Sequence, residues 1–118
     1  MQSKFKNDLG TIVIENEVIA RIAGLAAMEC YGVVGMAAKR LRDGLVHLLK
    51  MENLSKGVHV ETVENNELIV SLHIIVEYGT NIVAIANSLK ENVKYKVEET
   101  VGIPVSEINI IIEGVRVD

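Results

Sequence analysis

Apolar residues recur at helical spacing between about residue 16 and residue 30. The stripe consists of Val18, Ile22, Leu25 and Ala26, widened by Ile19, Ala23 and Cys30. This periodicity predicts an amphipathic helix that buries that face. Glu17 and Arg21 are four residues apart, so we expect them to pair on the solvent side. Gly32 suits the left-handed position past the helix end.

The strongest helix pattern in the chain covers residues 82–101. Its apolar positions follow one another at intervals of three and four, and they are Ile82, Ala86, Leu89, Val93, Val97 and Val101. Thr80 is the predicted N-cap. Gly102 is expected to end the helix, and Pro104 prevents its continuation.

Residues 37–54 predict a third, shorter helix with a basic side. Leucines share one face, while Lys39, Arg42 and Lys50 share the other. Residues 37–56 hold five basic and two acidic side chains in a chain whose net charge is −4. We expect the leucines to enter the core and the basic residues to face a protein partner or an anionic membrane surface.

The remaining apolar runs alternate as β-strands do. They cover residues 11–14, Val33-Val34, 57–64, 68–77 and 106–113. Residues 57–77 predict a hairpin. A loop formed by residues 65–67 places Val60 opposite Leu72 and His59 opposite His73, which keeps the apolar face uniform. A two-residue loop would mix the two faces, so the three-residue loop is favoured.

These elements predict an α+β fold in a single domain covering residues 1–118. We expect a mixed sheet of three or four strands, two long helices packed on one face of it, and the shorter basic helix. No Pro/Ser linker, low-complexity run or repeat divides the chain.

The chemistry-bearing residues do not form a catalytic motif. Cys30 lies on the edge of an apolar stripe and is interpreted as an inert buried thiol. The predicted hairpin brings His59 and His73 together beside Glu61 as a candidate metal site, although two exposed polar residues are the favoured interpretation. Gly32 and Gly35 are interpreted as a turn or a tight packing point. We therefore expect a protein that is not an enzyme and has no cofactor.

The composition adds limits on location and partners. Hydrophobic residues make up 49% of the chain and aromatic residues 3%, and the single cysteine fits a reducing compartment. The N-terminus has no apolar core of a signal peptide, and no apolar run reaches the ~20 residues of a membrane span. The acidic excess argues against nucleic acid. These features predict a cytoplasmic protein.

Several motifs together resemble one known family. They are the opening at residues 10–14, the run from Glu17 through residues 30–37, Ser55-Lys56-Gly57-Val58, the strand end at residues 76–80, and the close at residues 105–110 with Gly114-Val115. The pattern resembles the alkaline-shock-protein (Asp/Gls-type) family of the envelope stress response, in its short, YloU-like branch of Gram-positive bacteria.

The resemblance implies a non-catalytic protein that self-associates and is held near the membrane by a small membrane-anchored protein partner. It offers no catalytic residues to transfer. The resulting hypothesis is a cytoplasmic scaffold or adaptor, a homo-oligomer, in the cell-envelope stress response. The alternative is an accessory domain that binds a small acidic ligand or a lipid-pathway enzyme through the turn at residues 32–36 and the basic residues.

Overall fold

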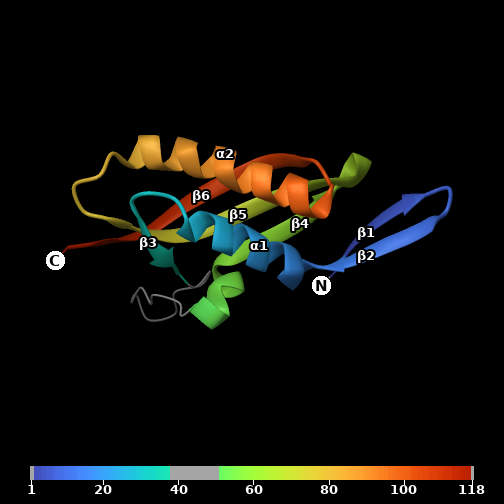
Figure 1. Cartoon of the computed structure of the whole chain (residues 1–118), viewed down its shortest axis with the longest axis horizontal. Helices are drawn as coiled ribbons and strands as arrows, with labels where there is room; N and C mark the ends of the chain where they lie inside the picture. Colours follow the sequence, from blue (N-terminus) through green and yellow to red (C-terminus); the bar gives the residue numbers. More distant parts are fainter. Residues whose placement is uncertain (1, 38–50, 118) are drawn as a thin grey trace.

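A computed structural model describes residues 2–37 and 51–117 and shows an α+β fold (Figure 1). The elements in chain order are β1 (Gln2–Asn7), β2 (Gly10–Glu15), α1 (Asn16–Met28), β3 (Val33–Met36), the 3-10 helix η1 (Met51–Gly57), β4 (Val58–Val63), the 3-10 turn η2 (Glu64–Asn66), β5 (Glu67–Glu77), α2 (Ile82–Val101) and β6 (Val105–Arg116). The predicted fold class and the two long helices are confirmed. Most of the predicted basic helix, residues 38–50, lies outside the described residues.

A four-stranded mixed sheet is built around β5. Strand β6 pairs with β5 in parallel along most of its length, while β3 and β4 pair antiparallel with it. Because β6 occupies one edge of β5, β3 and β4 share the other edge one after the other. The parallel neighbours β5 and β6 are joined through α2, as a crossover connection requires.

The predicted hairpin register is wrong by two residues, although the apolar face is correct. The loop has three residues, but they are Glu64–Asn66 instead of residues 65–67. Val60 therefore lies opposite Val70, and His59 lies opposite Ser71. Asn66 has a φ of 58°, a left-handed conformation that asparagine tolerates better than most residues. This turn lets the strand resume at Glu67.

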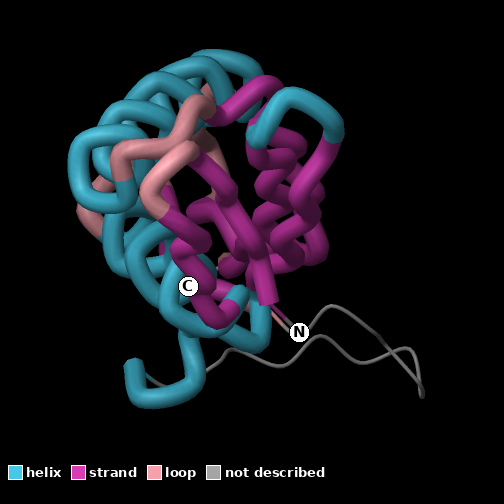
Figure 2. The backbone as a smooth tube through the Cα atoms, turned by 90° about the vertical axis from the view of Figure 1, so that its right-hand side faces the viewer, coloured by secondary structure: helices cyan, strands magenta, loops and turns pink. Residues whose placement is uncertain are grey.

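Side chains from both helices and the sheet meet in one core. Strand β5 contributes alternate residues, and the two helices cover them in Figure 2, where most helical turns gather on one side of the strands. The fully buried larger residues include Ile19, Met36, Leu68, Leu72, Ile74 and Leu89.

The predicted face of α1 is rotated from the observed one. The helix buries Ile19, Ala20, Ala23, Gly24, Ala26 and Ala27. Val18 and Leu25, placed in the core by the sequence pattern, are 51% and 45% exposed. The reason is a close approach to η1: a Cβ atom built on Gly24 would lie 3.2 Å from Cβ of Leu54. Mostly small side chains fit between α1 and the elements packed against it.

Helix α2 follows its prediction more closely. Leu89, Val93 and Val97 are buried as expected, but Ile85 takes the core position expected for Ile82, which is 41% exposed. The N-cap is Asn81 instead of Thr80, because its Oδ1 accepts the Ala84 N–H at 3.1 Å. The helix ends at Gly102, as predicted.

The pairing of β1 with β2 was not predicted. The two strands form a separate antiparallel ribbon that projects from one end of the fold (Figure 1). Its base is anchored through Ser3 and Phe5, which are 1% and 6% exposed. This ribbon extends the molecule to 54 Å in its longest dimension.

Candidate interaction surfaces

A shallow groove with an apolar floor lies along the outer side of α1. It is lined by Glu15, Glu17, Val18, Arg21, Ile22 and Leu25. Val18 and Leu25 are turned away from the core by the close packing of the helix on its other side, whereas Ile22 is partly buried and also packs against the core. The groove therefore exposes aliphatic side chains to solvent, which is typical of a surface that binds another molecule.

The rim of this groove is polar and mostly acidic. Glu17 and Arg21 form the predicted pair, with Oε1 and Nη2 3.8 Å apart and both side chains well exposed. Gln2 Nε2 donates to Glu15 Oε1 at 2.8 Å. An exposed ion pair contributes little to stability, so Glu17 and Arg21 can exchange partners when another molecule binds.

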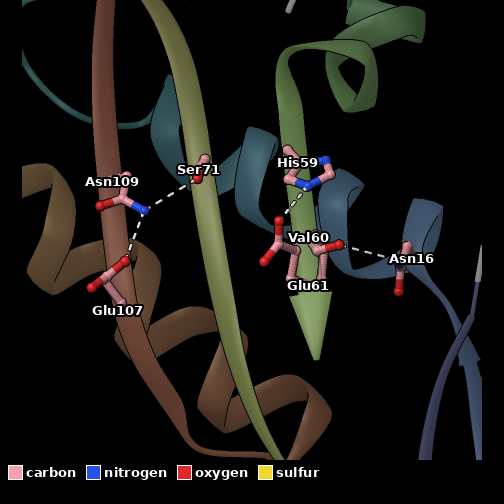
Figure 3. A network of polar contacts seen from close by, with 7 residues as sticks. All are labelled: Asn16, His59, Val60, Glu61, Ser71, Glu107 and Asn109. Atoms are coloured by element: carbon pink, nitrogen blue, oxygen red, sulfur yellow. Dashed lines mark hydrogen bonds and ion pairs between the residues drawn. The ribbon is translucent and has the colours of Figure 1, made fainter. Parts of the chain in front are cut away.

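Hydrogen bonds fix the base of the β1–β2 ribbon to the sheet and to α1. The Ser3 hydroxyl donates to Asn16 Oδ1 at 2.6 Å, and the Thr62 hydroxyl donates to Ser3 Oγ at 2.6 Å. Asn16 Nδ2 donates to the Val60 carbonyl at 3.1 Å (Figure 3). The ribbon thus leaves the body at a defined point instead of hanging from a loose linker.

A second groove lies at the opposite end of the molecule, where α2 begins. It is lined by Tyr31, Gly79, Thr80, Asn81, Ala84, Ile85 and Ser88. Tyr31 is 87% exposed and the nearby Tyr78 is 70% exposed. Gly32 adjoins the groove at a φ of 87°, and a Cβ atom there would overlap Cδ1 of Ile85. The predicted turn role is confirmed for Gly32, whereas Gly35 lies within strand β3.

The three metal candidates do not come together. His59 Nε2 lies 3.0 Å from Glu61 Oε1 in an exposed contact on β4 (Figure 3). His73 Nδ1 instead lies 3.1 Å from Glu113 Oε2 of β6, where the two side chains are only 15% and 16% exposed. In the observed register His59 lies opposite Ser71, two residues away from the predicted position opposite His73. Within residues 2–37 and 51–117, no group of three metal-binding side chains is found.

The outer side of the sheet also carries an amide-centred contact. Asn109 Nδ2 donates to Ser71 Oγ at 3.3 Å and to Glu107 Oε2 at 3.1 Å, joining β6 to β5 (Figure 3). Such contacts fix neighbouring strands in register and leave a polar surface.

Cys30 is buried, as the sequence predicted. Its thiol donates to the Ala26 carbonyl at 3.7 Å, and Asn92 Nδ2 lies 3.2 Å from Sγ. The first contact lies within the end of α1, and the second joins that end to α2.

On the outer face of α2, Tyr95 pairs with Glu99. A side-chain hydrogen bond to Glu99, together with the charge of that carboxylate, raises the pKa of Tyr95 above its ordinary value. Both groups are exposed, and the contact is a local feature of the helix surface.

Sequence reasoning missed the ribbon and the groove of α1. The partner-facing candidates that it did name, Lys39, Arg42 and Lys50, lie outside the described residues. One signal for the groove was available: apolar residues occupy α1 on more than one side, which is more than a single buried stripe requires.

Comparison with known proteins identifies the family. The model of the alkaline-shock-protein-23 family, whose description is "cell envelope-related function", matches residues 4–117. The chain belongs to the alkaline-shock-protein-23 family. The resemblance to the alkaline-shock proteins is therefore confirmed, and with it a relation to the cell envelope.

The relatives of this alkaline-shock-family chain include proteins of Gram-positive bacteria. YloU of Bacillus subtilis (strain 168) is 45% identical over 118 residues, which cover 99% of this chain and 98% of that protein. YqhY of the same strain is 33% identical, covering 93% and 80%. A Streptococcus pyogenes serotype M3 protein named stress response regulator gls24 homolog is 29% identical, covering 91% and 59%.

No solved structure gives a significant match to the chain. Among the helices in the described part of the chain, none has both the length and the apolar character needed to cross a membrane.

Proposed function

We propose that this alkaline-shock-family protein is a non-catalytic, self-associating scaffold or adaptor of the cell-envelope stress response. The family description supports a role connected with the envelope, and the name of the streptococcal relative supports a stress response. We place its action on the cytoplasmic side of the membrane, next to a membrane-anchored protein partner.

The observation that carries this proposal is the placement of exposed apolar side chains. Val18 and Leu25 lie in the groove of α1 with Ile22, while Tyr31 and Tyr78 lie near the start of α2. Exposed apolar and aromatic side chains that gather in grooves are typical of protein–protein contacts. A molecule with two such surfaces suits a role in assembly.

The basic residues Lys39, Arg42 and Lys50 are proposed to assist recruitment to the membrane or to its anchored partner. They belong to a segment of positive charge in an acidic chain. Each basic group near an anionic membrane surface is worth roughly 1 kcal/mol, so three alone give weak binding. Self-association would multiply such weak contacts into stable attachment.

The alternative function, binding of a small acidic ligand, has one observation in its favour. The groove beside Gly32 lies at the turn that the sequence singled out. Its seven lining residues include no lysine or arginine, so an acidic ligand would find no cation among them. We therefore favour the scaffold.

Sedimentation velocity over a concentration series tests the proposal directly. A scaffold should associate reversibly, with a sedimentation coefficient that rises with concentration. A chain that stays monomeric up to ~1 mM, where binding is worth only ~4 kcal/mol, would contradict it.

Recruitment is tested separately by fractionating host cells. Changing Lys39, Arg42 and Lys50 together to Glu should move the protein from the membrane fraction to the soluble fraction. Retention of the triple variant at the membrane would show that other residues make the recruiting contact.

A further inference from the structure

The two edges of the four-stranded sheet are covered to different extents. Strand β6 forms one edge, on the side of β5 opposite β3 and β4 (Figure 1). It has 12 residues, whereas β3 has four and β4 has six. On β4, the Val60 carbonyl points away from β5 and accepts the Asn16 amide, and Thr62 donates to Ser3 of the ribbon (Figure 3). Among the described strands, β6 pairs with β5 alone, so its other edge is the long and unpaired one.

Both ends of β6 carry features that hinder the addition of a further strand. The Val105 N–H donates to Glu98 Oε2 at 2.8 Å, so a side chain of α2 occupies the backbone there. The register with β5 shifts between Val105 and Glu107, and again between Ile112 and Gly114. Bulges of this kind twist an edge and protect native sheets against unwanted pairing. The ends of β6 are therefore poor places for a partner strand.

The middle of β6 lacks these protections. Residues 107–112 pair with β5 in six consecutive positions without a shift. Their sequence is Glu-Ile-Asn-Ile-Ile-Ile, which contains no proline and no lysine. Backbone groups of alternate residues point away from β5, and within the described chain no strand lies there to pair with them. We name residues 107–112 the open edge.

The side chains of the open edge differ between its two sides. Ile108 is buried, and Ile110 and Ile112 are partly buried against the core. Glu107 is exposed on the outer side of the sheet, where its Oε2 accepts a hydrogen bond from Asn109 (Figure 3). A strand laid along the open edge would therefore place alternate side chains beside isoleucines and the others beside a carboxylate.

Further carboxylates lie on the outer side of the sheet. Glu67 precedes the buried Leu68 on β5, so it points to the outer side near the start of β6. Glu113 lies just after the open edge, with its Oε2 3.1 Å from His73 Nδ1. Because opposite charges on neighbouring strands attract, a basic side chain on the outer side of an added strand would be favoured.

We propose that the open edge binds an extended segment of another protein, in which β-branched apolar residues alternate with lysine or arginine. The segment would add one strand to the sheet through backbone hydrogen bonds, with its apolar residues beside the core isoleucines and a basic residue beside Glu107. A segment of about six residues, about 20 Å long at ~3.3 Å per residue, covers the open edge. This inference rests on the adaptor part of the proposed function, because it names the chemistry of the protein partner, and it does not require self-association.

A synthetic peptide tests the open edge with the full chain. The probe is acetyl-Lys-Val-Thr-Val-Lys-Val-amide, whose valines share one side of an extended strand while its lysines share the other. Its control is the same peptide with every backbone nitrogen methylated, which keeps the side chains but has no backbone donor. Calorimetric titration at low ionic strength, up to ~1 mM peptide, should detect binding of the probe and none of the control. Amide hydrogen exchange should slow in residues 107–112 and stay unchanged in residues 58–63.

A charge exchange tests the predicted pairing at Glu107. Glu107→Lys brings like charges together, so it should weaken binding of the probe by about tenfold or more. A peptide with glutamate in place of both lysines should bind Glu107→Lys more tightly than it binds the wild type. Glu91→Lys makes the same change of charge at an exposed position of α2 and should bind the probe as the wild type does. Circular dichroism melting checks that each variant folds.

The outcomes distinguish the inference from the proposed function. Equal binding of probe and control, no binding of either, or slowed exchange only outside residues 107–112 would overturn the open edge, while self-association could still be observed. Slowed exchange of residues 107–112 on raising the protein concentration without peptide would assign the edge to a second copy, which also overturns the inference. Binding of the probe alone to a chain that stays monomeric would support the open edge and contradict self-association.

Discussion

Helices α1 and α2 cover the same core with buried side chains of different size. Helix α2 buries the large residues Ile85, Leu89, Val93 and Val97. Helix α1 buries mainly alanines and Gly24, and it leaves Val18 and Leu25 about half exposed. In α2 the large apolar residues mark the core. In α1 two of them mark the opposite side of the helix.

The difference follows from how closely each helix is packed. Helix α1 contacts α2, η1 and the sheet, and a Cβ atom added at Gly24 would lie only 3.2 Å from Leu54. Interiors are close-packed, so a short distance between elements admits small side chains. The large apolar residues of α1 are then available for contact with another molecule. Under the proposed function, the second apolar side of α1 is expected to contact another molecule.

The largest expected effect comes from truncating a buried side chain of α2. Leu89 is 0% exposed, so Leu89→Ala should lower the free energy of unfolding by about 2–5 kcal/mol through lost burial and a residual cavity. The matched change on α1, Leu25→Ala, should cost the monomer only about 1 kcal/mol, because about half of that side chain is already exposed. Urea denaturation at low protein concentration measures both. Equal losses would show that the two helices bury their leucines alike.

A smaller effect is expected where the turn after α1 meets α2. Gly32 and Gly79 both have a φ near 90°, but only at Gly32 would an added Cβ meet Ile85. Both changes to Ala incur about 1–2 kcal/mol for the left-handed backbone. Gly32→Ala should cost about 1 kcal/mol more through overpacking. Thermal melting of the two variants compares them, and equal melting temperatures would mean that Ile85 moves aside freely.

The cap of α2 should contribute less than these packing contacts. Asn81→Ala removes the side-chain acceptor of the Ala84 N–H and should destabilise the protein by about 1 kcal/mol. Thr80→Ala, which removes a hydrogen bond to the Glu77 carbonyl, serves as the neighbouring control. A greater loss from Thr80→Ala would restore the cap assignment that the sequence suggested.

The smallest effect concerns the solvent side of α2. Glu99 raises the pKa of Tyr95 by hydrogen bonding to the neutral phenol and by its charge, so Glu99→Gln should lower that pKa toward the ordinary value of about 10. The tyrosine would then ionise at lower pH. Ultraviolet titration in a background lacking Tyr31 and Tyr78 isolates this group. An unchanged midpoint would remove Glu99 as the cause.

The sequence predicted the elements with strong periodic patterns and missed those decided by distance between elements. Leu89, Val93 and Val97 were assigned correctly because their spacing leaves one buried face. The face of α1 depends on its approach to Leu54, about which local spacing says nothing. The hairpin error has a similar origin, because a shift by two residues preserves the faces, so face matching cannot separate the two registers.

The candidate sites were less predictable than the fold. The burial of Cys30 in an apolar environment followed from its place on a helical stripe. The separation of His59 from His73 could not be foreseen, because it depends on register. The ribbon was missed because Phe5 is the one large apolar residue in β1, too few to show alternation.

The central claim is that the outer apolar side of α1 serves contact between molecules and not the monomer's core. The most direct test is a Val18→Ser/Leu25→Ser double variant, studied by sedimentation velocity at high concentration and by urea denaturation at low concentration. The account predicts that association is lost while the free energy of unfolding of the monomer falls by only about 1–2 kcal/mol, because both side chains are already about half exposed. Association equal to that of the wild type, or a monomer destabilised by several kcal/mol, would contradict it.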